Sequence, residues 1–291
     1  PWDDDICWLY GASALSQRER ARLREESQSS FPHAGLYLLH SVEGKAIIRC
    51  TDFQSRPSHA DQLHVDVWLH GKNIACDAGT YLYSGESIWR NGLAHTAVHN
   101  TVTVDRQDQM KMLTRFTWTN WSRGHVHRHD ANVWEGEHNG YKRLADPVTH
   151  KRAVLSLNRN RWLVVDQLEG KQPHHFALHW LLSDLPYEQQ DHSILLSLDS
   201  IKYKAQVGVV EGKSTLSIVR GDPDSTRGWR SQYYGDKEPA ISLLLETDQP
   251  GATFWTFFGF EEDVIQIKEE TLKLLSPELR ISINLQTLVI K

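Results

Sequence analysis

Residues 56–105 read RPSHADQLHVDVWLHGKNIACDAGTYLYSGESIWRNGLAHTAVHNTVTVD. From residue 63 to residue 69 apolar and polar side chains alternate, as they do on a strand with one buried face. The apolar set is Leu63, Val65, Val67 and Leu69, and the set on the other face is His64, Asp66 and Trp68. Gly71-Lys72 then predicts a two-residue turn, and residues 73–77 return as the second strand. The stretch therefore predicts an antiparallel hairpin.

Polar residues are set into this hairpin and its flanks. The stretch holds five histidines (His59, His64, His70, His95, His99) and four aspartates (Asp61, Asp66, Asp77, Asp105). A two-residue turn would place Leu69 opposite Ile74 and Asp66 opposite Asp77. Like charges that face each other on a sheet repel, so we expect a cation, an arginine or a different register there. The alternating strands indicate structure, and the polar residues indicate a site.

The rest of the chain continues the strand pattern. Strands are predicted on both sides of a turn at Glu43-Gly44, and a hairpin is predicted through residues 158–160. Beyond the central stretch Gly, Pro, Asp or Asn interrupts short apolar runs about every 8–12 residues. Only residues 3–11 and 15–27 favour helix. We predict an all-β fold: a large stacked antiparallel β-sandwich, supersandwich-like, with a short helical N-terminal extension.

Composition excludes several classes of function. The chain has 291 residues, of which 40% are hydrophobic and 24% are charged, as is typical of a globular protein. No run approaches the ~18 apolar residues of a membrane span, and a net charge of −5 argues against nucleic acid or an anionic membrane as partner. The sequence has no phosphate-binding loop, dinucleotide fingerprint or G-x-S-x-G. Three cysteines do not predict a disulfide framework.

Three consecutive blocks carry a family resemblance: SHADQLHVDVWLHG, CDAGTYLYSG and AHTAVHNTVTVD. They resemble the heparinase II/III-like polysaccharide lyases, and weaker matches (YKRLADPVTHKR, RWLVVDQLEG, GWRSQYYGDKEPA) extend the likeness from about Phe31 to about Phe260. The resemblance implies a stacked-sheet domain that follows an upstream α/α-toroid. Residues 1–30 are then expected to be a helical connector and residues 31–291 the β-sandwich domain. It also implies a periplasmic or secreted protein.

The resemblance implies a function as well. Such lyases cleave acidic, uronate-containing polysaccharides by β-elimination, with the main acid and base expected in the helical domain. The sheet domain holds a metal, usually zinc, and the matching positions are His59, Asp77 and His99. Two imidazoles and a carboxylate suit zinc, but their spacing alone fits ordinary hydrogen-bonded histidines equally well. His64 and Asp66 are local alternatives if the hairpin register is as predicted.

One position departs from the family pattern. Several members place a catalytic histidine two residues before the H-A-D histidine, where this chain has Pro57. His59 or His64 would then take the role in the cleft, or the sheet domain would contribute nothing at that point. Tyr81, and beside it Tyr83, are further cleft candidates, although tyrosines on strands more often pack.

An acidic substrate needs local positive charge in a chain that is negative overall. Arg56 and Arg90 are the predicted substrate-binding cations, with Arg106, Lys111 and Arg115 nearby in the sequence. Protonated histidine could add to this charge.

Other interpretations stay open. His125, His127 and His129 alternate and predict either a metal array or, more simply, a solvated sheet face. The domain could be a carbohydrate-binding or scaffolding module without chemistry. It could also be a metal-dependent hydrolase, for which Asp61 or Asp105 would supply the base.

Overall fold

The computed structural model describes residues 3–15 and 29–289. Helix α1 (Asp3–Tyr10) and a 3-10 turn at residues 12–15 match the predicted helix at residues 3–11. The predicted helix at 15–27 lies almost wholly outside the described residues, and the boundary at residue 30 stays a prediction. None of the helices in the described ranges has the length and apolar character that crossing a bilayer requires.

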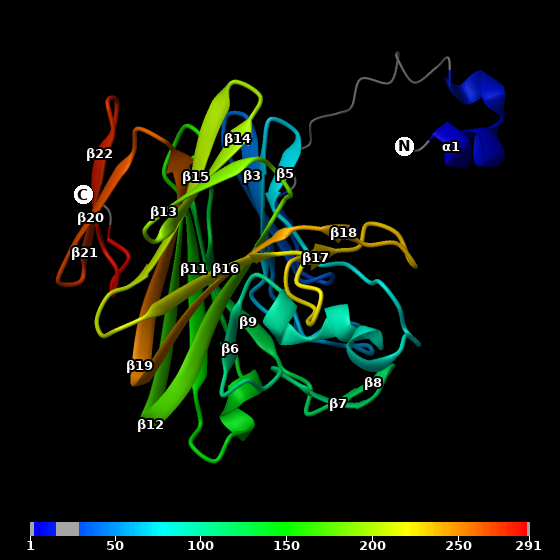
Figure 1. Cartoon of the computed structure of the whole chain (residues 1–291), viewed down its shortest axis with the longest axis horizontal. Helices are drawn as coiled ribbons and strands as arrows, with labels where there is room; N and C mark the ends of the chain where they lie inside the picture. Colours follow the sequence, from blue (N-terminus) through cyan, green and yellow to red (C-terminus); the bar gives the residue numbers. More distant parts are fainter. Residues whose placement is uncertain (1–2, 16–28, 290–291) are drawn as a thin grey trace.

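Antiparallel strands make up nearly all of the rest, which confirms the all-β prediction (Figure 1). The main sheet contains fifteen strands: β1 (Ser30–Phe31), β2 (Leu36–His40), β3 (Gly44–Arg49), β4 (Val65–Leu69), β5 (Lys72–Ala75), β6 (Val102–Val104), β9 (Gly124–His129), β10 (Val133–His138), β11 (Thr149–Ser156), β12 (Trp162–Leu182), β13 (Tyr187–Gln190), β14 (Ser193–Leu198), β15 (Ile201–Val209), β16 (Thr215–Arg220) and β19 (Ile241–Phe260).

Smaller sheets and 3-10 turns complete the fold. The small sheets are β7 (Lys111–Thr114) with β8 (Thr117–Thr119), β17 (Trp229–Arg230) with β18 (Glu238–Pro239), and β20 (Val264–Lys268) with β21 (Thr271–Leu275) and β22 (Arg280–Asn284). The 3-10 turns are η2 (Ser87–Trp89), η3 (Gly92–Ala94), η4 (Thr96–Val98) and η5 (Gly140–Arg143).

Two long strands, β12 and β19, organise the main sheet. They pair with each other along most of their length, with a register shift between Glu169 and His174. The first half of β12 also pairs with β11, whereas its second half pairs with β6 and β5. In the same way β19 pairs first with β16 and then with β15. The sequence predicts four short strands here, because Gly and Pro interrupt the pattern; the irregularity absorbs those residues and each pair of runs becomes one strand.

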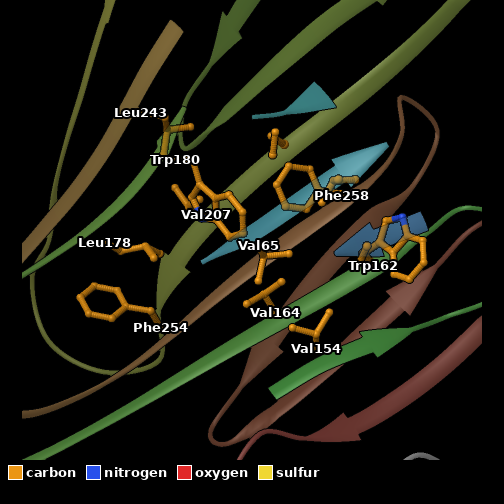
Figure 2. Close-up of a cluster of buried hydrophobic side chains, with 14 of the residues drawn as sticks. Val65, Val154, Trp162, Val164, Leu178, Trp180, Val207, Leu243, Phe254 and Phe258 are labelled. Atoms are coloured by element: carbon orange, nitrogen blue, oxygen red, sulfur yellow. The ribbon is translucent and has the colours of Figure 1, made fainter. Parts of the chain in front are cut away.

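Both faces of these long strands are buried. Trp162 and Val164 point into the main core, which Figure 2 shows together with Trp180 and Phe258. The intervening Leu163 and Val165 belong to a second core under β20–β22. Because alternate residues point to opposite faces, one strand can serve two cores. The β20–β22 sheet is therefore stacked on the main sheet.

The hairpin that is predicted from residues 63–77 forms, but its turn lies one residue earlier than predicted. His70 and Gly71 both have positive φ, at 48° and 74°, as the central residues of a type I′ turn do. Leu69 therefore pairs with Lys72 instead of Ile74, and a bulge follows between Val67 and Trp68. β5 ends at Ala75, so the predicted pairing of Asp66 with Asp77 is wrong. The prediction that the two segments pair is confirmed.

A buried ionic network ties the sheet to the loops around β4. Arg152 donates from Nε and Nη2 to the two carboxylate oxygens of Asp166, at 2.6 and 2.9 Å. Its Nη1 donates to the backbone oxygens of Leu63 and Asn100. The side chains of Arg152 and Asp166 are fully buried. The guanidinium therefore balances a buried charge and holds two loops at once.

Two histidines extend this network. The Gly140 N–H donates to Nδ1 of His138, so the proton of that ring must be on Nε2, which faces Nδ1 of His150 at 3.2 Å. Nε2 of His150 in turn donates to Asp166 at 2.7 Å. Burial, with His150 and Arg152 nearby, holds the pKa of His138 well below its usual range. Burial, and to a lesser extent Arg152, also lowers the pKa of His150 although Asp166 opposes this, so both rings are neutral links in a buried chain of hydrogen bonds.

We predict that Arg152→Leu lowers the free energy of unfolding by about 3–5 kcal/mol, because it leaves the buried Asp166 charge without a partner. The matched control is Arg128→Leu, which breaks the exposed pair with Asp130 and is expected to cost about 1 kcal/mol or less. Urea unfolding at pH 7 measures both. Equal losses for the two variants would contradict the role of Arg152.

We also predict a pH dependence of stability that His138 causes. The pKa of His138 is depressed in the folded state, so below the unfolded-state pKa of about 6.5 the unfolded chain binds a proton that the folded chain does not. The free energy of unfolding is therefore highest above a pH of about 6.5 and falls below it, by up to about 1.4 kcal/mol per pH unit. Urea unfolding between pH 7.5 and 5 should therefore give a shallower pH slope for His138→Gln than for the unchanged chain. The exposed His125→Gln serves as control. Parallel curves for all three proteins would show that His138 is not the group that titrates.

Candidate metal centre

Three loops bring His59, Asp77 and His99 together. His59 precedes β4, Asp77 follows β5, and His99 follows η4. One ligand atom from each residue can be chosen such that all three lie within 4.8 Å of one another. Among the histidine, cysteine and acidic side chains of residues 3–15 and 29–289, these three form a group that could hold a metal ion.

Hydrogen bonds fix the three side chains. Nδ1 of His99 lies 2.9 Å from Oδ2 of Asp77, and Oδ1 of Asp77 accepts the Gly79 N–H at 2.6 Å. Nε2 of His59 is hydrogen bonded to Oγ1 of Thr80 at 3.0 Å. Nε2 of the fully buried His99 has no hydrogen-bond partner among the described residues. Since buried polar atoms are normally satisfied, this nitrogen and the two-imidazole, one-carboxylate donor set fit a zinc ligand shell.

The charge states of the group also fit a metal. Burial, together with the neighbouring His99, lowers the pKa of His59, so its ring is neutral at pH 7 and has a free lone pair. Burial opposes ionisation of Asp77, but the imidazoles of His99, His64 and His59 hold its pKa well below the usual range. Metal ligands must be unprotonated, and both residues meet that condition near neutral pH.

His64 lies behind the group and does not reach solvent. It is 5% exposed. Its Nδ1 accepts the Asn100 N–H at 3.0 Å, so the ring proton is on Nε2. That N–H faces Asp66 and Asp77 at 3.7 and 3.6 Å. Neither distance is that of a hydrogen bond, and Nε2 of His64 has no hydrogen-bond partner among the described residues. The cleft role of His64 and its alternative role as a metal ligand stay predictions.

Asn100 is one of three residues of the site that the sequence did not predict. Its side-chain Nδ2 donates to the backbone oxygens of Val65 and Cys76 at 2.9 and 3.1 Å, and its Oδ1 accepts the Leu181 N–H at 2.6 Å. The side chain thus joins β4, the segment after β5 and β12. The only signal in the sequence was its place beside His99 in the H-N-T-V block. Thr80 and Arg152 were missed as well.

The other candidate residues are not part of this group. Tyr81 is half-buried and packs edge-on against Trp89, with ring centroids 5.4 Å apart. Arg56 and Arg90 are exposed, and Pro57 is buried. The catalytic and substrate-binding roles of these side chains stay predictions.

The interpretation as a metal-dependent hydrolase loses support. Asp61 pairs with Nε of Arg49 at 2.8 Å, and Asp105 contacts Nδ1 of His174 at 2.7 Å. Both carboxylates that a hydrolase would need as base therefore already have partners.

The histidines of β9 behave as a solvated face. His125 and His127 are exposed, and His127 contacts Glu137 at 3.1 Å. His129 lies near the backbone oxygen of Leu38 at 3.1 Å. In the described part of the chain these three side chains do not form a group that could hold a metal ion.

Curated proteins with similar sequences include two heparin-sulfate lyases. The one from Pedobacter heparinus is 26% identical over 136 residues, which are 46% of this chain and 19% of that protein. The one from Bacteroides stercoris is 31% identical over 121 residues, which are 40% of this chain and 16% of that protein. The matched part is thus a small share of each relative.

Solved structures share the fold. Heparan sulfate lyase HepC from Pedobacter heparinus superposes with a TM-score of 0.69 at 17% identity, over 97% of this chain and 47% of that one. A structure of heparinase III gives a TM-score of 0.69 at 14% identity, over 87% of this chain and 41% of that one. This chain therefore spans less than half the length of both solved proteins.

The family described as heparinase II/III-like, C-terminal, matches residues 23–269. That range covers most of the chain and contains the candidate metal centre, the hairpin and both long strands. The chain belongs to the heparinase II/III-like family and carries its C-terminal domain.

Proposed function

We propose that this chain is the sheet domain of a polysaccharide lyase that cleaves an acidic, uronate-containing polysaccharide by β-elimination, and that it works as part of a longer protein. The observation that carries the proposal is the family match over residues 23–269. Two relatives named as heparin-sulfate lyases support an acidic polysaccharide as substrate. An upstream α/α-toroid is the proposed source of the rest of the active site.

β-Elimination sets three chemical requirements. The uronate carboxylate must be neutralised, a base must remove the C5 proton, and an acid must protonate the departing O4. The exposed Arg56 and Arg90 could neutralise the carboxylate. Tyr81 and the neutral ring of His59 are the groups on the sheet side that could exchange a proton.

We further propose that His59, Asp77 and His99 would hold one divalent metal, with zinc the best match to the donor set. A bound zinc would supply a fixed positive charge that crosslinks the three loops. A ring nitrogen committed to a metal has no lone pair for a proton. Metal binding by His59 would therefore assign that residue to the scaffold and leave the main acid and base to the upstream part.

We predict that protein purified without chelator contains about one equivalent of zinc per chain. His59→Ala and Asp77→Ala should each remove it, because either change deletes a ligand, whereas the exposed His127→Ala should keep it. Metal analysis gives the content, and chelator should lower the melting temperature of the unchanged chain and of His127→Ala, but not of His59→Ala or Asp77→Ala. Unchanged protein without metal, with no gain in stability on adding zinc, would contradict the metal proposal.

We predict that the 291 residues alone are inactive, because the rate gain from assembled catalytic groups collapses when part of the set is absent. The full-length gene product should convert heparan sulfate, alginate or another uronate polymer. Ultraviolet absorbance of the unsaturated product measures both proteins, and hydrolysis gives no such signal. Turnover by the 291 residues alone would overturn this division of labour. If the full-length protein binds uronate polymers but turns none over, the domain is a binding module instead.

A further inference from the structure

Three aromatic rings from separate loops meet on the surface. The ring centroid of Tyr83 lies 5.1 Å from that of Phe116 and 5.0 Å from that of Tyr234. The three residues stay 41%, 41% and 57% exposed. Phe116 is at the turn between β7 and β8, and Tyr234 is in the loop between β17 and β18. Figure 1 shows both small sheets on the same side of the molecule.

Two arginines flank these rings. The guanidinium carbons of Arg56 and Arg115 each lie 5.5 Å from the centroid of Phe116. Nη1 of Arg56 also donates to the backbone oxygen of Phe116 at 2.9 Å. Neither arginine forms an ion pair with a carboxylate of the described residues. A guanidinium stacked on a ring keeps its in-plane N–H groups free for an anion.

The loops that carry these side chains are held in place. Backbone N–H groups of Ser231 and Gly235 donate to the backbone oxygens of Ala78 and Tyr81, at 2.8 and 2.9 Å. Beside them Nζ of Lys237 lies 3.2 Å from the ring centroid of Trp229. Such pre-organisation lowers the entropy cost of binding a ligand.

Thr80 connects these loops to the candidate metal centre. Its Oγ1 is hydrogen bonded to the His59 ring, and its backbone oxygen accepts the hydroxyl of Ser231 at 2.9 Å. Arg56 and His59 also lie on the same short loop. A ligand on the rings would therefore be bound by the segments that position His59.

We propose that Tyr83, Phe116, Tyr234, Arg56 and Arg115 form a binding platform for an anionic sugar residue of a polysaccharide. This inference rests on the proposed function and extends it. The aromatic faces would cover the C–H face of the sugar ring, and the guanidinium groups would bind its carboxylate or sulfate. The chain carries a net charge of −5, so two unpaired arginines at one place give the platform its selectivity for an anion.

The alternative occupant is the upstream part of the longer protein. The composition of the platform favours the saccharide, because two of its three rings carry a hydroxyl and the third is contacted by two guanidinium groups, so the rings do not form one continuous apolar patch. Surfaces that dock another domain permanently are more apolar than this.

Calorimetric titration of the 291-residue chain with a heparan sulfate octasaccharide tests the platform. Phe116→Ala should raise the Kd about tenfold, as expected for loss of a stacked ring and its cation–π contacts. Arg115→Gln should raise it and flatten its salt dependence. Leu113→Ala, in the same hairpin and 67% exposed, is the matched control and should stay within about twofold of the unchanged chain.

Three outcomes would overturn the proposal: no saturable binding by the unchanged chain, equal affinity for a neutral maltooctaose, and an unchanged Kd for Phe116→Ala. If that unchanged Kd comes with a lower melting temperature of the full-length Phe116→Ala protein, the rings belong to the contact with the upstream part. Failure of the lyase proposal looks different: the full-length protein gives no unsaturated product while the platform variants still weaken binding.

Discussion

The amide of Asn100 is the contact on which the site depends. It joins the backbone at Val65, Cys76 and Leu181, and two of the proposed ligands are next to these contacts, since Asp77 follows Cys76 and His99 precedes Asn100. Arg152 holds the backbone oxygen of Asn100 from the other side, through a buried charge pair. A buried amide that lost any one of these partners would carry an unsatisfied group. The loops therefore have one arrangement, and the donor atoms of the candidate metal centre are positioned before any ligand arrives.

Much of the fold could be predicted from local patterns. The alternation in residues 63–69 and the Gly-containing turn were sufficient to place β4 beside β5, because strand periodicity and turn chemistry act over a few residues. The length of β12 could not be predicted this way. Gly170 and Pro173 interrupt its pattern, which predicts two short strands, and residues 170–173 have no partner on β19. Pairing with β19 on both sides of this break makes the two runs one strand.

The candidate site shows the same division. The identity of His59, Asp77 and His99 came from motif resemblance, and their approach to one another depends on β12, which lies far along the chain. Asn100 was visible in its motif, but its role was not, because an amide that joins three segments has no local pattern. A contact between Asn100 and Leu181 has no trace in either segment alone. Local sequence therefore indicates which residues have suitable chemistry, and topology decides which of them meet.

The expected repulsion between Asp66 and Asp77 shows how the two levels interact. The predicted register was wrong, since the I′ turn needs positive φ at both central residues and Gly71 serves as the second. The two carboxylates nevertheless lie near one ring, since Nε2 of His64 is 3.7 Å from Asp66 and 3.6 Å from Asp77. That ring is held by a backbone N–H on its other nitrogen, so its dipole points permanently between the acids. A different register was one of the three expected ways to avoid the repulsion, and the structure has it, since Asp77 lies beyond the end of β5. His59, Asp77 and His99 are nevertheless the residues whose ligand atoms come within 4.8 Å of one another, so the topology of the loops decides which of these side chains meet.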